Sequence, residues 1–260
     1  MTDGQGRTAL VTGASAGLGA EFAQQLAGAG MNLVLVARRE DRLQVVADEV
    51  REAHGREVLP VVDDLADPEA PERIHATLAE RGVHVDYLVN NAGAAGPDLL
   101  EDRDWSAHQA FYQLMMVSVA HLCHLFVPPM RERGWGRVIN VASMAARIAR
   151  AGGCNYGPTK AYVVALSEEL AMTLAGTGVH VCALCPGFTH TEFHERAGMM
   201  DMKNASSDML WYDAATVARE GIAAVERGRA VYPSGRLYRL VDPLMQSVWT
   251  RRLFRIEAAQ

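Results

Sequence analysis

Basic residues are too scarce in this 260-residue chain to form a strongly positive surface: 25 Lys and Arg stand against 31 Asp and Glu, for a formal net charge of −6. Contacts to nucleic-acid phosphates need concentrated Lys and Arg, so we expect no nucleic-acid partner. The N-terminus also lacks a positively charged segment followed by an apolar run. We therefore expect no signal peptide and a cytoplasmic location.

Cysteine is scarce as well, because only Cys123, Cys154, Cys182 and Cys185 are present. Four cysteines in apolar surroundings do not predict a disulfide framework. Cys182 and Cys185 have C-x-x-C spacing, but they lie in the run Val179–Leu184, which predicts a buried strand. Residues three apart on a strand point to opposite faces, so we interpret both as inert core thiols rather than a redox or metal pair.

Charge is missing from one long stretch, Trp105–Met130, which contains no Asp, Glu, Lys or Arg. A run of this length could span a bilayer. It nevertheless holds polar residues and ends in a pair of prolines: His108, Gln109, Gln113, Ser118, His121, His124, Pro128 and Pro129. We expect no transmembrane segment here, but a helix covered by a sheet on one side and by a second subunit on the other.

What the chain does contain is a regular alternation of two patterns. Short runs rich in β-branched residues predict strands at Thr8–Val11, Asn32–Ala37, Val58–Val62, Tyr87–Val89, Val138–Val141 and Val179–Leu184. Helical patterns lie between them at Leu18–Ala29, Glu40–Ala53, Ala70–Arg81, Ser106–Arg133 and Ala161–Ala175. Such alternation predicts one α/β domain over residues 1–260, with a doubly wound parallel sheet flanked by helices on both faces.

The last third of the chain differs in texture. Residues 192–211 are rich in methionine and have no clear period, which predicts a mobile flap. Residues 236–256 predict a basic, apolar-studded helical tail, interrupted at Pro243. We favour packing of this tail on the core or on a neighbouring subunit, with contact to an anionic membrane surface as the alternative.

A glycine-rich turn follows the first predicted strand and opens the first predicted helix. It reads Thr-Gly-Ala-Ser-Ala-Gly-Leu-Gly from residue 12 and offers Gly13, Ser15, Ala16, Gly17, Leu18 and Gly19 as cofactor contacts. Backbone N–H groups and a helix N-terminus at this position can receive a pyrophosphate. The spacing differs from the commoner G-x-G-x-x-G, and a tight connection alone is the alternative interpretation.

The residues after the second predicted strand bear on the choice of cofactor. An acidic residue there would bind the ribose 2′-hydroxyl of NAD, but this chain has Arg38 and Arg39. A guanidinium suits a 2′-phosphate, so we expect NADP(H). The alternative is that both arginines merely begin an exposed helix.

Tyr156 and Lys160 are four residues apart and so share one helix face. We expect the ammonium to lower the pKa of the tyrosine, which is near ~10 when free. The tyrosine could then act as general acid or base for a carbonyl/alcohol pair. Ser143, which follows the strand Val138–Val141, could hydrogen-bond the same oxygen.

These motifs occur in one order along the chain: the glycine turn, Asn90-Asn91-Ala92-Gly93, Ser143, Tyr156 with Lys160, and Pro186-Gly187 through Thr191. The pattern resembles the short-chain dehydrogenase/reductase family over residues 7–230. The resemblance implies a Rossmann-type fold, with Ser143, Tyr156 and Lys160 as catalytic residues. It also implies a homodimer or homotetramer and a substrate-covering role for the flap.

The resemblance further implies which residues hold the cofactor. Asp64 and Leu65 match the pair that holds the adenine. The ribose would be lined by Asn91, Ala92 and Gly93 and contacted by Lys160. The carboxamide end would be held by Pro186, Gly187, Thr189 and Thr191.

One position departs from the family. The family usually has an asparagine where this chain has Met115, counting back from Pro128. Methionine cannot make the hydrogen bonds of an amide. In the family that asparagine helps to hold a water that links the lysine to solvent, so we expect slower turnover rather than an inactive enzyme.

The sequence therefore predicts an NADP(H)-dependent reductase or dehydrogenase with Tyr156 as general acid/base. A nucleotide-binding or regulatory protein with impaired catalysis is the second hypothesis, and epimerase or dehydratase chemistry is the third. We expect no metal, because His190 and His194 lack a third ligand nearby. Apolar residues that could line a pocket for a hydrophobic ketone are Phe188, Phe193, Met199, Met200, Met202, Met209, Leu210 and Trp211.

Overall fold

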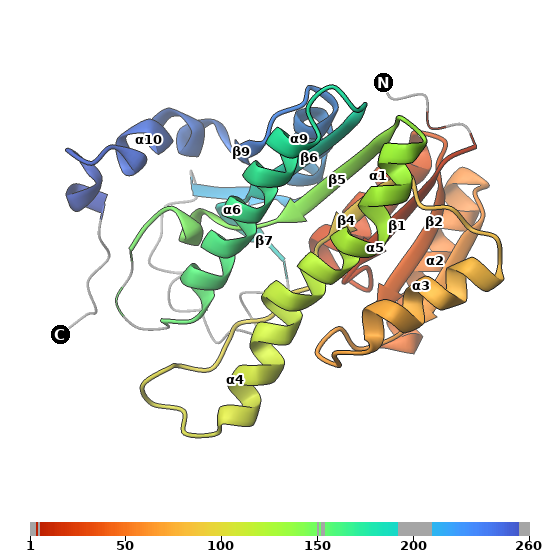
Figure 1. The fold of residues 1–260 in the computed structure, drawn as a ribbon, viewed down its shortest axis with the longest axis horizontal. Coiled ribbons are helices and arrows are strands. Elements are labelled where there is room, and N and C mark those ends of the chain that lie inside the picture. Colours follow the sequence, from red (N-terminus) through yellow and green to blue (C-terminus); the bar gives the residue numbers. More distant parts are fainter. Residues whose placement is uncertain (1–3, 5, 150, 152–153, 192–209, 255–260) are drawn as a thin grey trace.

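The computed structural model describes residues 4, 6–149, 151, 154–191 and 210–254. A seven-stranded parallel sheet with the order β3-β2-β1-β4-β5-β6-β9 forms its centre (Figure 1). The strands are β1 (Thr8–Thr12), β2 (Asn32–Ala37), β3 (Val58–Val62), β4 (Tyr87–Asn90), β5 (Gly136–Val141), β6 (Val179–Cys185) and β9 (Val231–Pro233). The strand order reverses beside β1, and in open α/β sheets ligands bind at the carboxyl ends of the strands around such a reversal.

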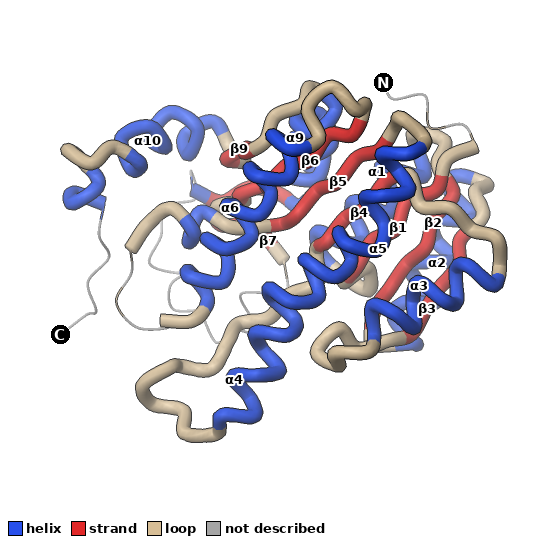
Figure 2. The backbone as a smooth tube through the Cα atoms, viewed as in Figure 1, coloured by secondary structure: helices blue, strands red, loops and turns tan. Residues whose placement is uncertain are grey.

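Helices cover both faces of the sheet, as Figure 2 shows. On one face α1 (Gly17–Gly28), α2 (Glu40–His54) and α9 (Ala214–Glu226) share an apolar core with the strands. On the other face lie α3 (Ala70–Glu80), α5 (Ser118–Glu132) and α6 (Tyr156–Thr173). The strands read as continuous apolar runs because both of their faces are buried. The predicted single-domain Rossmann-type α/β fold is confirmed.

The uncharged stretch forms one long helix in three parts. These are α4 (Trp105–Tyr112), a five-residue π-helical turn (Gln113–Val117) and α5. In the described part of the chain, Trp105–Glu132 is the one helix long and apolar enough to cross a bilayer, and half of its most apolar window is buried. Because α5 packs on the sheet, the core accounts for much of its apolar character.

The chain after residue 185 contains elements that the sequence patterns did not predict. A small pair of parallel strands, β7 (Phe188–His190) and β8 (Trp211–Asp213), lies beside the main sheet. The helix α9 begins at Asp213, which caps the N-terminus of α9, because its carboxylate accepts a hydrogen bond from the Thr216 N–H. Strand β9 has only three residues, too few to show a period. The predicted flap falls mostly on residues 192–209, outside the described residues.

Two predicted helix boundaries are wrong. Helix α6 begins at Tyr156 rather than Ala161, because Pro158 falls within its first turn, where no intrahelical N–H is needed. Helix α10 (Arg236–Gln246) runs through Pro243 instead of breaking there, and a 3₁₀ turn follows at Arg251–Phe254.

The C-terminal tail packs on the core with one side only. Tyr238 and Met245 of α10 are buried, and Asp242 forms an ion pair with Arg147. Several large apolar side chains remain exposed: Leu240, Leu244, Val248, Trp249 and Leu253. Packing on the core is thus confirmed for Tyr238 and Met245, and contact with a membrane or a second subunit stays a prediction.

The C-x-x-C pair lies in the core as expected. Cys182 is buried in the cluster shared with α1 and α9, whereas Cys185 is buried in a second cluster with Val163 and Tyr238. Both thiols are free, and burial raises the pKa of each to about 12. They point to opposite faces of β6, and a thiol that stays protonated is a poor nucleophile and a poor metal ligand.

Candidate active site

The glycine turn is packed so closely that side chains would not fit at two of its positions. A Cβ added to Gly13 would lie 2.9 Å from the Ala92 Cα, and one added to Gly19 would lie 2.3 Å from the Gly13 carbonyl oxygen. Gly13 and Gly17 also have positive φ angles of 64° and 56°. The backbone can turn directly into α1, and no side chain caps the N–H groups at its start. This cradle fits a pyrophosphate.

Asn91 fastens this turn to the end of β4. Its side-chain amide donates to the carbonyl oxygens of Thr12 and Gly13, at 2.9 and 3.3 Å. The Thr12 hydroxyl in turn accepts the backbone N–H groups of Asn91 and Ala92. The side-chain amide of Asn91 and the N–H groups of Asn91 and Ala92 are thus engaged by the protein. Thr12 is a site residue that the motif analysis missed, although its position at a strand end next to the turn was visible.

The two arginines after β2 have different contacts. Arg39 reaches back over the glycine turn, where its guanidinium donates to the Ser15 hydroxyl at 2.9 Å. Arg38 is more exposed and lies 3.4 Å from the carboxylate of Asp64. The interpretation that they only begin an exposed helix fails for Arg39. A phosphate beside Ser15 would meet Arg39 first, and Arg38 would have to leave Asp64 to join it.

Three candidate catalytic residues converge at the carboxyl ends of β5 and β6. Ser143 follows β5, and its hydroxyl accepts the Ala145 N–H at 3.1 Å. Tyr156 begins α6 and is hydrogen-bonded to Ser143. Lys160 lies one turn later, with its ammonium nitrogen 5.8 Å from the centre of the tyrosine ring. The strand–loop–helix connection from β5 to α6 brings these three residues together.

The expected lowering of the tyrosine pKa is wrong. Burial raises the pKa of Tyr156 to about 12, and the hydrogen bond with Ser143 offsets only part of that rise. Tyr156 is therefore held in its protonated form at neutral pH, which suits a proton donor.

Lys160 is a buried ammonium. It is 5% exposed, and burial lowers its pKa to about 8. Its nitrogen donates to the Val141 carbonyl oxygen at 2.7 Å. An ammonium has three donors, so others remain for the hydroxyls of a bound ligand.

Met115 lies beside Gly93, on the side where Lys160 also approaches this glycine. It is 1% exposed, within the π-helical turn, and its sulfur accepts the Ala94 N–H at 3.4 Å. A Cβ placed on Gly93 would contact both the Met115 sulfur, at 3.4 Å, and the Lys160 nitrogen, at 3.8 Å. An apolar thioether thus stands beside the lysine where the family usually has an amide.

The loop after β6 connects to the glycine turn and to the C-terminal helix. Thr191 lies against Gly17, since a Cβ on that glycine would be 3.2 Å from the Thr191 Cβ. Thr189 is buried, and its hydroxyl donates to the Gly187 carbonyl. Gly187 packs on the ring of Tyr238, where a Cβ would come within 1.9 Å. Pro186 accepts the Met144 N–H at 2.8 Å, which joins this loop to the segment after β5.

Aromatic rings mark the base of the predicted flap. Phe188 and Trp211 stack with ring centroids 5.1 Å apart, and His190 lies 5.0 Å from the same tryptophan. Leu210 packs on the cluster around Tyr238. The other predicted pocket residues, and His194, lie outside the described residues. Within the described residues no three His, Cys, Asp or Glu side chains cluster as metal ligands.

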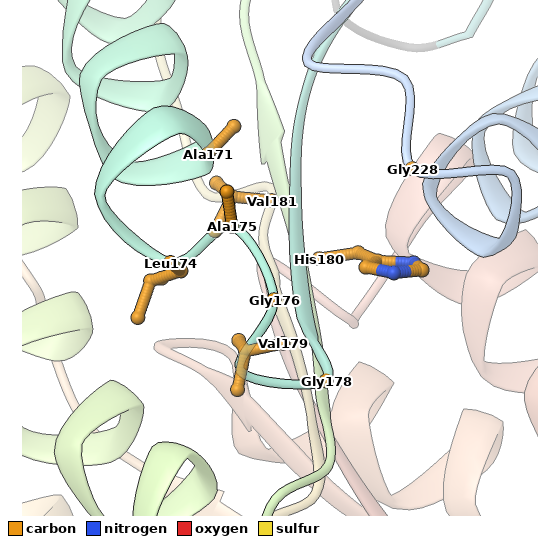
Figure 3. A pocket seen from close by; sticks show the side chains of 9 residues that line it. All are labelled: Ala171, Leu174, Ala175, Gly176, Gly178, Val179, His180, Val181 and Gly228. Atoms are coloured by element: carbon orange, nitrogen blue, oxygen red, sulfur yellow. The ribbon is translucent and has the colours of Figure 1, made fainter.

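A separate cavity of about 300 Å³ lies at the opposite edge of the sheet (Figure 3). It is formed where α6 ends and β6 begins, and its lining includes Leu174, His180 and Gly228. The catalytic candidates are at the carboxyl ends of the strands, so this cavity is not their substrate pocket.

Comparison with known proteins identifies relatives that cover most of the chain. The family model of short chain dehydrogenases matches residues 7–201. A probable NADP-dependent dehydrogenase of Haemophilus influenzae is 37% identical over 72% of this chain and 75% of its own length. A 7beta-hydroxysteroid dehydrogenase of Collinsella aerofaciens is 32% identical over 72% and 70%. The structure of a short-chain dehydrogenase from Sphingobium yanoikuyae with NADPH covers 87% of each chain, with 29% identity and a TM-score of 0.78.

Proposed function

The chain belongs to the short-chain dehydrogenase family, and we propose that it is an NADP(H)-dependent oxidoreductase that acts on a hydrophobic ketone or secondary alcohol. The observation that carries this proposal is the convergence of half-buried Ser143 and Tyr156 with buried Lys160 at the carboxyl edge of the sheet. The glycine cradle ends at the same edge, so a dinucleotide lying across the strand ends would meet all three residues.

Bound NADPH supplies the hydride to the carbonyl carbon of the substrate. Tyr156 donates its proton to the carbonyl oxygen, and its raised pKa keeps that proton in place until the oxygen becomes basic. Ser143 directs its hydroxyl at the same oxygen. Lys160 binds ribose hydroxyls with the donors that Val141 leaves free, and its positive charge stabilises the phenolate that forms. In the reverse reaction Tyr156 takes the proton from the alcohol.

A preference for NADP(H) is supported by the arrangement of Arg39 over Ser15 and by relatives named for NADP. A 2′-phosphate in this place would accept hydrogen bonds from both side chains. Asp64 and Leu65 lie at the end of β3, where they would hold the adenine.

The substrate class is supported by the aromatic stack of Phe188 and Trp211 and by a relative that acts on a steroid. A bulky apolar ketone would bury its carbon skeleton against these rings. We also propose that the enzyme is a homodimer or homotetramer, because Val117 and Tyr162, on the helices that follow β4 and β5, leave apolar side chains exposed.

The experiment is a screen in which cofactor oxidation is measured with NADPH and NADH in parallel, against ketones of increasing bulk. The wild type is compared with Tyr156→Phe, which keeps the ring and removes the proton. We expect NADPH oxidation with bulky apolar ketones, at a rate about 1,000-fold higher than in the variant. Binding of NADPH without turnover of any carbonyl compound would contradict the proposal.

A further inference from the structure

The residue before the candidate proton donor directs its side chain away from its own helix. Asn155 occupies the N-cap position of α6, yet its side chain makes no capping hydrogen bond. An asparagine at this position ordinarily accepts a hydrogen bond from the first turn of its helix. Here the side chain is buried, with the residue 2% exposed, and its amide is used elsewhere.

All of the strong hydrogen-bonding groups of this amide have partners in other segments. Its oxygen accepts the Tyr112 hydroxyl at 2.6 Å. Its nitrogen lies 2.7 Å from the Pro97 carbonyl oxygen and 2.9 Å from Nδ1 of His108. One side chain therefore ties the start of α6 both to α4 and to the loop after β4. Figure 1 shows α4 projecting from the body of the fold, so these bonds are a main connection between the two helices at this end.

The network specifies the protonation state of His108. Because the Asn155 amide nitrogen can only donate, Nδ1 must accept, and the proton of the neutral imidazole must be on Nε2. Nε2 then donates to the Asp102 carbonyl oxygen at 3.0 Å. The ring is 1% exposed and is stacked by Trp105 with centroids 5.5 Å apart. Both the orientation and the tautomer of His108 are thereby defined.

We propose that Asn155 is a positioning residue for Tyr156, and that it acts through the neutral, Nε2-protonated form of His108. This inference rests on the function proposed above. Asn155 and Tyr156 share a peptide bond, so anchoring the amide to α4 sets the direction in which the first turn of α6 presents the phenol. A misplacement of about 1 Å at a reacting group can lower a rate by about 100-fold.

The variant Asn155→Asp distinguishes positioning from simple packing. Its carboxylate cannot donate to Nδ1 of neutral His108, but it can accept a hydrogen bond from Nδ1–H of the protonated imidazole. In this variant, acid pH should therefore restore the hydrogen bond between Nδ1 of His108 and residue 155. In the wild type, a proton on Nδ1 would face the NH₂ group of Asn155, so two donors would meet. The other titratable groups facing His108 are Tyr112 and Asp104. Hydrogen bonds from Ser106 and, to a smaller extent, the proximity of His108 lower the pKa of Asp104.

The test is the pH dependence of kcat and KM for carbonyl reduction in the wild type, Asn155→Ala and Asn155→Asp, from about pH 5.5 to about pH 8.5. The matched control is Ser167→Ala. Ser167 lies on α6 far from Tyr156, and its hydroxyl accepts a buried hydrogen bond from the side-chain amide of Asn140 on β5. We expect Asn155→Ala to lower kcat by about 10- to 100-fold with KM within about threefold. Asn155→Asp should regain about fivefold toward acid pH, while the control keeps its kcat within about twofold.

A kcat within about threefold of wild type for Asn155→Ala, or a pH profile of Asn155→Asp parallel to that of the wild type, would overturn the inference. If the wild type reduces no carbonyl compound, the proposed function fails instead. The inference is then decided by NMR titration of ¹³Cζ-labelled tyrosine, with the signal of Tyr156 assigned from Tyr156→Phe. A changed titration of Tyr156 in Asn155→Ala supports the positioning role, and an unchanged one overturns it.

Discussion

Two buried cations lie at the two ends of β5 and have opposite surroundings. Arg137, at the amino end, is 9% exposed; it pairs with Glu226 at 2.9 Å and donates to the carbonyl oxygens of Gly136 and Gly178. Lys160, near the carboxyl end, is 5% exposed and donates to the carbonyl of Val141. No carboxylate of the described residues pairs with it. A neutralised cation thus lies at one end of the strand, and a cation without a carboxylate partner among the described residues contacts the other end.

The difference separates a structural site from a functional one. The guanidinium of Arg137 also stacks on the ring of Trp135, 4.5 Å from its centroid. Both the charge and the planar surface of this group thus make contacts within the fold. The ammonium of Lys160 is disfavoured by burial, which lowers its pKa to about 8. Such a group lowers the stability of the folded state and is retained where a ligand uses its charge.

Of the two cations, Lys160 should have the larger effect on activity when it is removed. We expect Lys160→Met to lower kcat/KM by at least about 100-fold, because the phenolate of Tyr156 loses its stabilising charge. The free energy of unfolding at pH 7 should not fall. Burial disfavours the ammonium by on the order of 3 kcal/mol, which offsets the loss of about 1 kcal/mol from the bond to Val141. Steady-state kinetics and urea denaturation measure the two effects, and a clearly destabilised variant would contradict this account.

Removal of Arg137 should have the reverse pattern. Arg137→Met leaves the carboxylate of Glu226 half-enclosed without its cation, which we expect to lower the free energy of unfolding by about 3 kcal/mol. The catalytic edge is at the far end of the strand, so kcat should stay within about threefold of the wild type. Urea denaturation and steady-state kinetics of the same preparation provide both numbers. A loss of activity as large as that of Lys160→Met would remove the distinction between the two cations.

The pH dependence should follow Lys160 and not Tyr156. As pH rises through about 8, Lys160 loses its proton, so the rate of carbonyl reduction should fall about tenfold per unit above that value. The unfolded chain still binds that proton up to about pH 10.5, so between these values the folded state gains stability relative to Lys160→Met. Below about pH 8, Lys160 is charged in both the folded and the unfolded chain, so burial of its ammonium lowers the free energy of unfolding by the full amount. Rate profiles and paired denaturation curves test this, and a rate that stays flat to about pH 10 would contradict it.

Restoring an amide next to the lysine should have the smallest effect. Met115→Asn replaces the thioether beside Lys160 and Gly93 with a group that can hold a water. We expect kcat to rise by about two- to fivefold, with KM unchanged. Met115→Leu, which keeps the volume without the amide, is the matched control and should show no gain. An unchanged kcat in Met115→Asn would show that the thioether does not slow the proton relay.

Features defined by spacing along one segment could be predicted from the sequence. The glycine turn and the Tyr156/Lys160 pair belong to this class, because a strand–turn–helix connection and a single helical turn determine their geometry. The contacts of Arg38 and Arg39 could not be assigned, since the partners Asp64 and Ser15 are on different elements. The raised pKa of Tyr156 was missed because burial by distant segments outweighs the hydrogen bond with Ser143.

The hydrogen-bond network around Asn155 could not be predicted from the sequence. His108 and Pro97 are far from Asn155 in the chain, and a lone buried asparagine has no signature of its own. Strand β9 escaped prediction because three residues carry no period, although it completes the sheet beside β6.

The most direct measurement of the central claim is the transfer of the hydride itself. The enzyme is incubated with a bulky apolar ketone and NADPH deuterated at C4 of the nicotinamide, separately on each face, and the alcohol is analysed by mass spectrometry. The account predicts one deuterium on the carbinol carbon from one of the two cofactors, and almost no alcohol with Tyr156→Phe. Alcohol formed without deuterium from either cofactor, or formed equally fast by Tyr156→Phe, would contradict it.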